Sequence, residues 1–232
     1  MTTPTPTTVL VAEDHAIVRQ GLCALLKADG QFRIVGEAQD GREAVAMART
    51  LKPDVILMDI AMPVLNGLEA TRQILAANPA AKVVILSAHS DDAYVERMNA
   101  AGVAGFLEKQ TSADILTKAI REVAKGNRFF SPSIAKRLGT DATKPRDRNG
   151  LIKADAARLT SRESEVLQLV AEGSANKQVA AELGISIKTV EKHREHLMEK
   201  LDIHDTAGLT RYAIGTGVIE SGGALKPSKV EN

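Results

Sequence analysis

Residues 9–125 alternate short apolar runs with amphipathic stretches, and this alternation is the feature that most constrains the fold. The apolar runs have the length of buried strands, and the amphipathic stretches have the spacing of helices with one buried face. Regular alternation of strand and helix predicts a parallel sheet with helices on both faces. The expected strands are 9–12, 32–38, 55–58, 82–86 and 105–107, and the expected helices are 16–28, 41–50, 68–77, 93–101 and 112–125.

The remainder of the chain has a different pattern, because apolar residues after position 159 recur only at helical spacing. A polar segment with Pro145 and Gly150 precedes this region and lacks any periodicity, as flexible linkers do. We therefore expect an α/β domain and a small all-α domain. The expected divisions are a disordered N-terminus at 1–8, the α/β domain at 9–125, a linker with a short helix at 126–158, the all-α domain at 159–219 and a flexible tail at 220–232.

Composition excludes several classes of protein. Hydrophobic residues make up 44% of the chain and charged residues 25%, with a net charge of +1, as in an ordinary globular protein. Aromatic residues make up only 3%, which argues against recognition of single strands by stacking. The lone Cys23 excludes an internal disulfide and is expected to be a packing residue. We find neither an apolar run of about 20 residues nor a signal-peptide pattern, so the expected location is the cytoplasm, with no membrane partner.

Reactive side chains stand where four of the expected strands end. The carboxyl ends of parallel strands meet at one edge of a sheet, where α/β folds build their sites. Clustered carboxylates suit Mg²⁺, an aspartate can accept a phosphoryl group as a nucleophile, and a hydroxyl and an ammonium can donate to its oxygens. The residues at these strand ends are Glu13 and Asp14, Asp59, Ser87 and Lys109.

Each of these residues also has a simpler interpretation. Glu13 and Asp14 stand before a helix, whose N-terminus favours acids. Ser87 alone is typical of a loop hydroxyl, and Lys109 alone is typical of a solvated surface lysine. Their joint occurrence at four strand ends favours a single acidic pocket, with Asp59 as its phosphoryl acceptor.

Residues 9–125 resemble the receiver domain of two-component response regulators, a flavodoxin-like (βα)5 fold. This resemblance implies a histidine kinase that phosphorylates Asp59, and Phe106 as a switch residue. It also implies Asp14, Asp59 and the backbone carbonyl of Ala61 as direct Mg²⁺ ligands, with Glu13 acting through water. Many receivers follow the lysine at this position with a proline in a cis bond, whereas this chain has Gln110. The matching residues are Glu13-Asp14-His15, Asp59-x-x-Met62-Pro63-x-x-Asn66-Gly67, Ser87-Ala88 and Phe106-Leu107-Glu108-Lys109.

A helix-turn-helix hinge is expected at Leu183-Gly184-Ile185-Ser186, because Gly184 can end one helix and Ser186 can cap the next. The following helix, 187–201, combines a buried stripe with a polar, partly basic face that suits a DNA major groove. An ordinary solvent-facing helix is the alternative interpretation of its charges. The expected buried stripe consists of Val190, Leu197 and Leu201.

Residues 159–219 resemble the LuxR-type helix-turn-helix, so that the whole chain resembles regulators of the NarL/FixJ type. The matching residues are Leu159-Thr160-x-Arg162-Glu163-x-Glu165-Val166-Leu167, Asn176-Lys177-Gln178-Val179-Ala180, Ile185-Ser186-x-Lys188-Thr189-Val190-x-x-His193 and Lys200-Leu201. The resemblance implies DNA phosphate contacts from Lys188, Thr189, His193, Arg194 and Lys200, and base-edge contacts from Glu191, Lys192 and Glu195. Ala175 departs from the Ser or Thr helix cap that is frequent in the family.

The expected function is phosphorylation-controlled transcription, with no catalysis beyond the protein's own phosphorylation and dephosphorylation. A module of roughly 60 residues reads few base pairs, so we expect phosphorylation to promote homodimers on double-stranded promoter DNA. One alternative keeps the fold but replaces phosphorylation with partner binding. Another is a Mg²⁺-dependent phosphatase, although Ala61 stands where such enzymes usually carry a further acid. His89 is expected either to influence the lifetime of the acyl phosphate or to be a loop surface residue.

Overall fold

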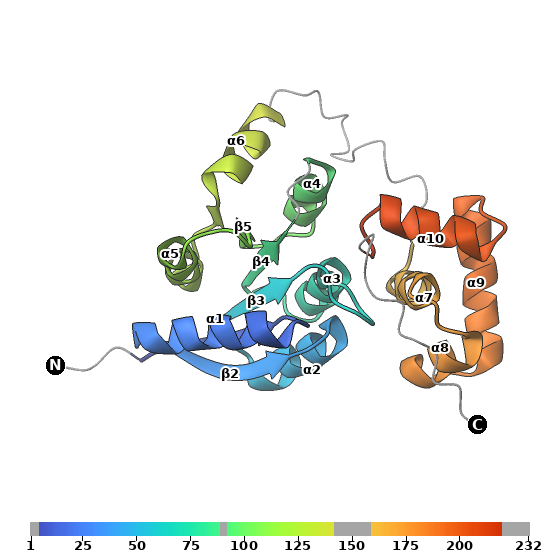
Figure 1. Cartoon of the computed structure of the whole chain (residues 1–232), viewed down its shortest axis with the longest axis horizontal. Helices are drawn as coiled ribbons and strands as arrows, with labels where there is room; N and C mark the ends of the chain where they lie inside the picture. Colours follow the sequence, from blue (N-terminus) through green and yellow to red (C-terminus); the bar gives the residue numbers. More distant parts are fainter. Residues whose placement is uncertain (1–4, 89–91, 142–158, 220–232) are drawn as a thin grey trace. The chain divides into compact units, whose positions relative to one another are not determined.

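The chain forms two compact units, residues 1–144 and 145–232, which are described separately. The structure, a computed structural model, describes residues 5–88, 92–141 and 159–219 (Figure 1). The expected C-terminal tail at 220–232, most of the expected linker and His89 lie outside the described residues.

The first unit is built on a six-stranded, entirely parallel sheet in the order β2-β1-β3-β4-β5-β6. The order of its first five strands is that of doubly wound, flavodoxin-like folds, so the predicted fold class is confirmed. The strands are β1 (Thr7–Ala12), β2 (Phe32–Ala38), β3 (Val55–Asp59), β4 (Val83–Ser87), β5 (Gly105–Glu108) and β6 (Phe129–Phe130).

Helices cover both faces of this sheet (Figure 1). Side chains alternate between faces along a strand. Val55 and Leu57 of β3 therefore pack with the first and fifth helices, and Ile56 and Met58 pack with the second, third and fourth. Cys23 is free and buried on the first of these faces, as predicted. The helices are α1 (Ala16–Asp29), α2 (Gly41–Leu51), α3 (Gly67–Ala77), α4 (Asp92–Ala100), α5 (Ala113–Ala124) and α6 (Pro132–Asp141).

The segment after α5 belongs to the sheet and its core, whereas the sequence predicted a linker from residue 126 with only a short helix. In β6, Phe130 pairs in register with Phe106 of β5, and the Ser131 amide donates to the Phe106 carbonyl at 3.1 Å. The side chain of Ile134 in α6 is fully buried in the same cluster as Phe106. A strand of two residues shows no alternation, which is why the sequence did not predict it.

The first strand begins two residues earlier than expected, so the prediction of disorder at 1–8 is wrong for Thr7 and Thr8. The backbone amide and hydroxyl of Thr8 donate to Asp54 Oδ2 at 2.8 and 2.6 Å. The Asp54 amide donates in return to the Thr8 hydroxyl at 2.9 Å. These side-chain hydrogen bonds extend β1 beyond its apolar residues.

The described residues of the second unit form helices with the expected ends. Thr160 and Glu163 make a capping box at the start of the first helix. Gly184 ends the second helix with φ at 62°, and the Ser186 hydroxyl caps the third by accepting from the Thr189 amide at 3.1 Å. These helices are α7 (Ser161–Ala171), α8 (Asn176–Leu183), α9 (Ile187–Leu201) and α10 (Thr206–Gly215).

The α8 N-terminus carries no side-chain cap at Ala175, where the sequence departs from the family pattern. Gln178 supplies part of the missing cap, because its Oε1 accepts from the Ala175 amide at 2.8 Å. Within the described parts of both units, none of the helices combines the length and apolar character required to cross a membrane.

Replacing Ile134 by alanine tests whether α6 is part of the core of the first unit. We expect Ile134→Ala to lower the free energy of unfolding of the first unit by about 2–5 kcal/mol, because it deletes a fully buried side chain. Ile17→Ala is the matched control, since Ile17 is 84% exposed and should change stability by less than about 0.5 kcal/mol. Urea unfolding measures both variants. A loss at Ile134 as small as at Ile17 would show that α6 does not pack on the sheet.

Candidate functional site

Two buried carboxylates lie side by side at the carboxyl edge of the sheet. Asp59 is the last residue of β3, and Glu13 directly follows β1, where Ala12 pairs with Met58. Glu13 is fully buried and Asp59 is 2% exposed. The Glu13 amide donates to the Ala38 carbonyl of β2 at 3.1 Å, which holds the chain in strand geometry as far as this residue.

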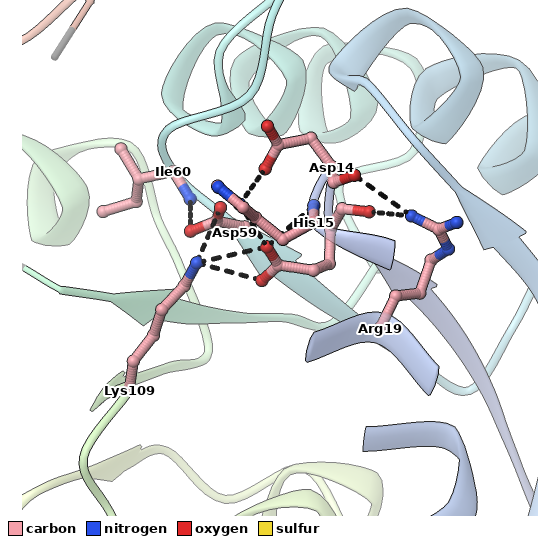
Figure 2. A network of polar contacts seen from close by, with 7 residues as sticks. Asp14, His15, Arg19, Asp59, Ile60 and Lys109 are labelled. Atoms are coloured by element: carbon pink, nitrogen blue, oxygen red, sulfur yellow. Dashed lines mark hydrogen bonds and ion pairs between the residues drawn. The ribbon is translucent and has the colours of Figure 1, made fainter. Parts of the chain in front are cut away.

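A single ammonium group contacts both carboxylates (Figure 2). Lys109 Nζ lies 2.9 Å from Asp59 Oδ2 and 3.0 Å from Glu13 Oε2. The Lys109 amide donates to the Ser87 carbonyl at 2.8 Å, so the ends of β4 and β5 fix the base of this side chain. The other carboxylate oxygen of Asp59 accepts from the Ile60 amide at 2.8 Å. The structure thus brings together three of the residues predicted for the pocket.

Negative charge exceeds positive charge among these buried groups. Burial and the neighbouring Glu13 raise the pKa of Asp59 to about 6, although Lys109 acts in the opposite direction. Three of the buried oxygens without a hydrogen-bond partner in the described residues belong to this pocket, and Lys109 or His15 lies within ion-pair distance of each: Glu13 Oε2, Asp14 Oδ1 and Asp59 Oδ2. Carboxylate oxygens with uncompensated charge fit a hard divalent cation.

Asp14 and His15 form the outer rim of the pocket. The Asp14 side chain is 25% exposed, and its Oδ1 lies 2.8 Å from His15 Nδ1. Glu13, Asp14 and His15 each offer one atom that could bind a metal ion, and these three atoms all lie within 4.8 Å of one another. The negative charge of Asp14 raises the pKa of the His15 imidazole. The sequence did not predict this contact between His15 and Asp14.

The other predicted receiver residues lie close in the chain but differ in their surroundings. Ser87 is buried at the end of β4, and Ala61 is half-buried in the loop after Asp59. Phe106 lies within the core, three residues before Lys109, rather than in the pocket. The described peptide bonds are all trans, including the bond from Lys109 to Gln110.

The loop after Asp59 approaches the strand so closely that it requires glycine. A Cβ at Gly67 would lie 2.0 Å from the Asp59 carbonyl oxygen. The Gly67 amide donates to the Ile60 carbonyl at 2.8 Å, and the Asn66 side chain caps α3 by accepting from the Glu69 amide at 3.0 Å. The Asn66-Gly67 pair therefore brings the start of α3 into contact with the backbone of Asp59, the candidate phosphoryl acceptor.

The predicted DNA-reading helix is α9. Its buried residues include Val190 and Leu197, as expected, while Leu201 is half-buried. His193 is also half-buried. The other side chains predicted to face DNA along most of the helix are exposed to solvent: Lys188, Thr189, Glu191, Lys192 and Glu195.

Two other predicted DNA contacts have partners inside the domain. Lys200 Nζ donates to both carboxylate oxygens of Glu163, at 2.8 and 2.7 Å, and so ties the end of α9 to the start of α7. Arg194 donates to the Asn176 side chain at 2.8 Å and to the Thr206 hydroxyl at 3.0 Å. The sequence did not predict these contacts, because the partners lie 12 to 37 residues away. Phosphate contacts by Lys200 and Arg194 stay predictions.

A hollow of about 570 Å³ runs along one side of α9. Its lining includes a row of three glutamates at helical spacing, two of which were predicted to contact bases. The lining residues are Asn176, Glu191, Arg194, Glu195, Met198, Glu199 and His204. This side of α9 therefore carries three glutamates beside Arg194, and the exposed lysines of α9 are Lys188, Lys192 and Lys200.

The acidic pocket and the helix-turn-helix in one chain define a two-domain regulator, and comparison with known proteins agrees. The family model for the response regulator receiver domain matches residues 9–121, and that for bacterial regulatory proteins of the luxR family matches residues 157–213. The chain belongs to the response regulators that combine a receiver domain with a LuxR-type DNA-binding domain.

Individual relatives align over nearly the whole chain. The transcriptional regulatory protein DegU of Brevibacillus brevis is 33% identical over 91% of this chain and 94% of its own. LiaR of Bacillus subtilis is 38% identical over 88% and 95%. A structure of the response regulator RcsB of Salmonella typhimurium has a TM-score of 0.55 and 26% identity over 90% and 98%. Another, with two RcsB dimers bound to two parallel DNAs, has a TM-score of 0.54 and 26% identity over 89% and 97%.

The Lys200–Glu163 pair predicts an acid-sensitive second unit. Burial raises the pKa of Glu163, but hydrogen bonds from Lys200 and Thr160 outweigh it and hold that pKa below its usual value. The pair therefore stabilises the fold fully above the unfolded-state pKa of about 4.3, and this contribution is lost as the pH falls through the lower, folded value.

We expect the urea midpoint for unfolding of the second unit to decrease as the pH is lowered below about 4. Glu163→Gln should make this midpoint depend less on pH. Glu199→Gln, at an exposed position on α9, is the matched control and should retain the wild-type profile. Urea titrations followed by the NMR signals of the second unit measure each midpoint. An acid loss in Glu163→Gln as steep as in wild type would contradict the assignment.

Proposed function

We propose that this protein is a response regulator in which Mg²⁺-dependent transfer of a phosphoryl group from a histidine kinase to Asp59 controls dimerisation and DNA binding. The observation that carries this proposal is the contact of one ammonium, Lys109, with two buried carboxylates at the sheet edge. The pocket's excess negative charge supports a divalent cation, and its lysine supports an incoming phosphoryl group. A cytoplasmic location stays a prediction.

The residues of the pocket have distinct tasks in this reaction. A carboxylate oxygen of Asp59 bonds to phosphorus while the bond from phosphorus to the kinase's histidine nitrogen breaks, and the electron pair of that bond stays on the nitrogen. Lys109 and the Ser87 hydroxyl donate to the phosphoryl oxygens. Asp14, Asp59 and the Ala61 carbonyl would hold Mg²⁺, with Glu13 acting through water. When bound, the metal neutralises charge on the transferring group.

β6 and α6 support a way in which a change at the pocket could affect the segment that precedes the DNA-binding domain in the sequence. Lys109 belongs to the chain segment that follows β5, and Phe106 of the same strand packs in one cluster with Ile134. The Ser131 amide is bonded to the Phe106 carbonyl. A change at Phe106 would therefore act on the backbone and core contacts of the segment that leads out of the receiver.

Dimerisation of this chain is inferred from two observations. A helix-turn-helix unit of this size contacts few base pairs, so two units are needed for useful specificity. RcsB, which aligns with 89% of this chain, has been solved as dimers bound to DNA. We infer that phosphorylated dimers of this chain bind paired half-sites in double-stranded promoter DNA.

Asp59→Ala tests the phosphoryl acceptor. With acetyl phosphate and Mg²⁺, we expect intact-mass spectrometry to show one added phosphoryl group on wild type and none on the variant. Asp114→Ala, at an exposed position of α5, is the matched control and should be labelled like wild type. Sedimentation of the labelled protein should show dimers. Equal labelling of Asp59→Ala would exclude Asp59 as the acceptor, and labelled protein that stays monomeric would exclude the dimer.

Lys192 and Lys200 are expected to serve DNA binding differently. Lys192 is exposed in the middle of α9, so Lys192→Ala should relax preference at one base position, by about 1–3 kcal/mol. Lys200→Ala should weaken all sequences alike and flatten the dependence of affinity on salt. Affinities for a site and its single-base variants at several salt concentrations separate the two effects. An unchanged salt slope in Lys200→Ala would assign that lysine to Glu163 alone.

A further inference from the structure

Arg19 of α1 contacts the backbone that carries the two acids of the β1–α1 turn. Its Nη1 donates to the Glu13 carbonyl at 2.7 Å and lies 3.3 Å from the Asp14 carbonyl (Figure 2). Its Nε lies 3.5 Å from a carboxylate oxygen of Glu37 in β2. The Arg19 side chain is only 11% exposed, whereas the Glu37 side chain is 42% exposed. The guanidinium thus joins the turn to the neighbouring strand.

This arrangement fixes the direction of the two acidic side chains. A carbonyl next to a fully buried residue such as Glu13 needs a donor, and Arg19 supplies it for two successive peptide groups. Once those peptides are fixed, the side chains that branch from them are directed into the pocket. The planar guanidinium suits several acceptors at once, and its positive charge also offsets the repulsion between the acids.

We propose that Arg19 is a positioning residue for the divalent cation, acting through the backbone carbonyls of Glu13 and Asp14 without touching the metal. This inference rests on the proposed function, because it assumes that the acidic pocket binds a divalent cation. Loss of a group that orients metal ligands typically weakens metal affinity about 10- to 100-fold. We expect Arg19→Gln to lie near the lower end of that range, since the carboxylates themselves remain.

The test measures Mn²⁺ binding directly, by the electron paramagnetic resonance signal of free Mn²⁺ during titration of the full chain. Mn²⁺ favours the same oxygen ligands as Mg²⁺. Arg121→Gln is the matched control: Arg121 also holds α1, through an ion pair with Asp29 at 2.6 Å, but at the opposite end of the helix from the acids. Unfolding midpoints of both variants in metal-free buffer report any general loss of stability.

The proposal predicts a Mn²⁺ dissociation constant about tenfold higher in Arg19→Gln and unchanged in Arg121→Gln. Arg19→Lys retains a cation and a donor, so its constant should fall between those of wild type and Arg19→Gln, and it carries the test if Arg19→Gln does not fold. Wild-type affinity in both Arg19 variants, or equal weakening in Arg121→Gln, would overturn the positioning role. Absence of Mn²⁺ binding by wild type would instead contradict the proposed function.

Discussion

The contact of Lys109 with Glu13 and Asp59 is the interaction on which the account of this protein depends. The Lys109 ammonium lies 2.9 Å from the Asp59 carboxylate and 3.0 Å from the Glu13 carboxylate. One positive charge therefore faces two buried negative charges, and the pocket keeps uncompensated negative charge. Burying such charge is costly unless it is paired. The parallel sheet imposes this cost, because it delivers the ends of β1, β3 and β5 to the same edge, and a divalent cation is a ligand that would relieve it.

The same strands connect the pocket to the segment that leaves the receiver. Lys109 directly follows β5, Phe106 lies within that strand, and β6 pairs with its edge. Ile134 of α6 is buried in the same cluster as Phe106, so the first part of the expected linker belongs to the core of the unit that holds the lysine.

Much of this arrangement could be predicted from the sequence, since it follows from local patterns. The runs 55–58 and 83–86 are apolar and are followed by Asp59 and Ser87, which predicts both the strands and the edge at which those residues lie. What could not be predicted depends on contacts between distant residues. The Arg19 guanidinium contacts backbone carbonyls of the preceding turn and the Glu37 carboxylate of β2. Lys200 pairs with Glu163, which lies 37 residues away in the sequence. No periodicity marks such pairs.

Short or polar elements were also missed, for a different physical reason. Phe129 and Phe130 form a strand too brief to alternate. Thr7 and Thr8 join β1 through hydrogen bonds, from Thr7 to the Gln31 carbonyl and from Thr8 to Asp54, rather than through apolar burial. β6 pairs with the edge of β5, and Thr7 and Thr8 extend the central strand β1 along β2. Their stability therefore comes from tertiary structure, which propensity and pattern do not contain.

The most direct test of the central claim is the stability of Asp59→Asn with and without Mg²⁺. Removing one carboxylate leaves Glu13 and Lys109 as a matched pair, so the account predicts that the first unit of the variant unfolds at higher urea than wild type in metal-free buffer. It also predicts that Mg²⁺ stabilises wild type and not the variant. A variant that is less stable than wild type without metal, and that Mg²⁺ stabilises to the same extent, would contradict the account.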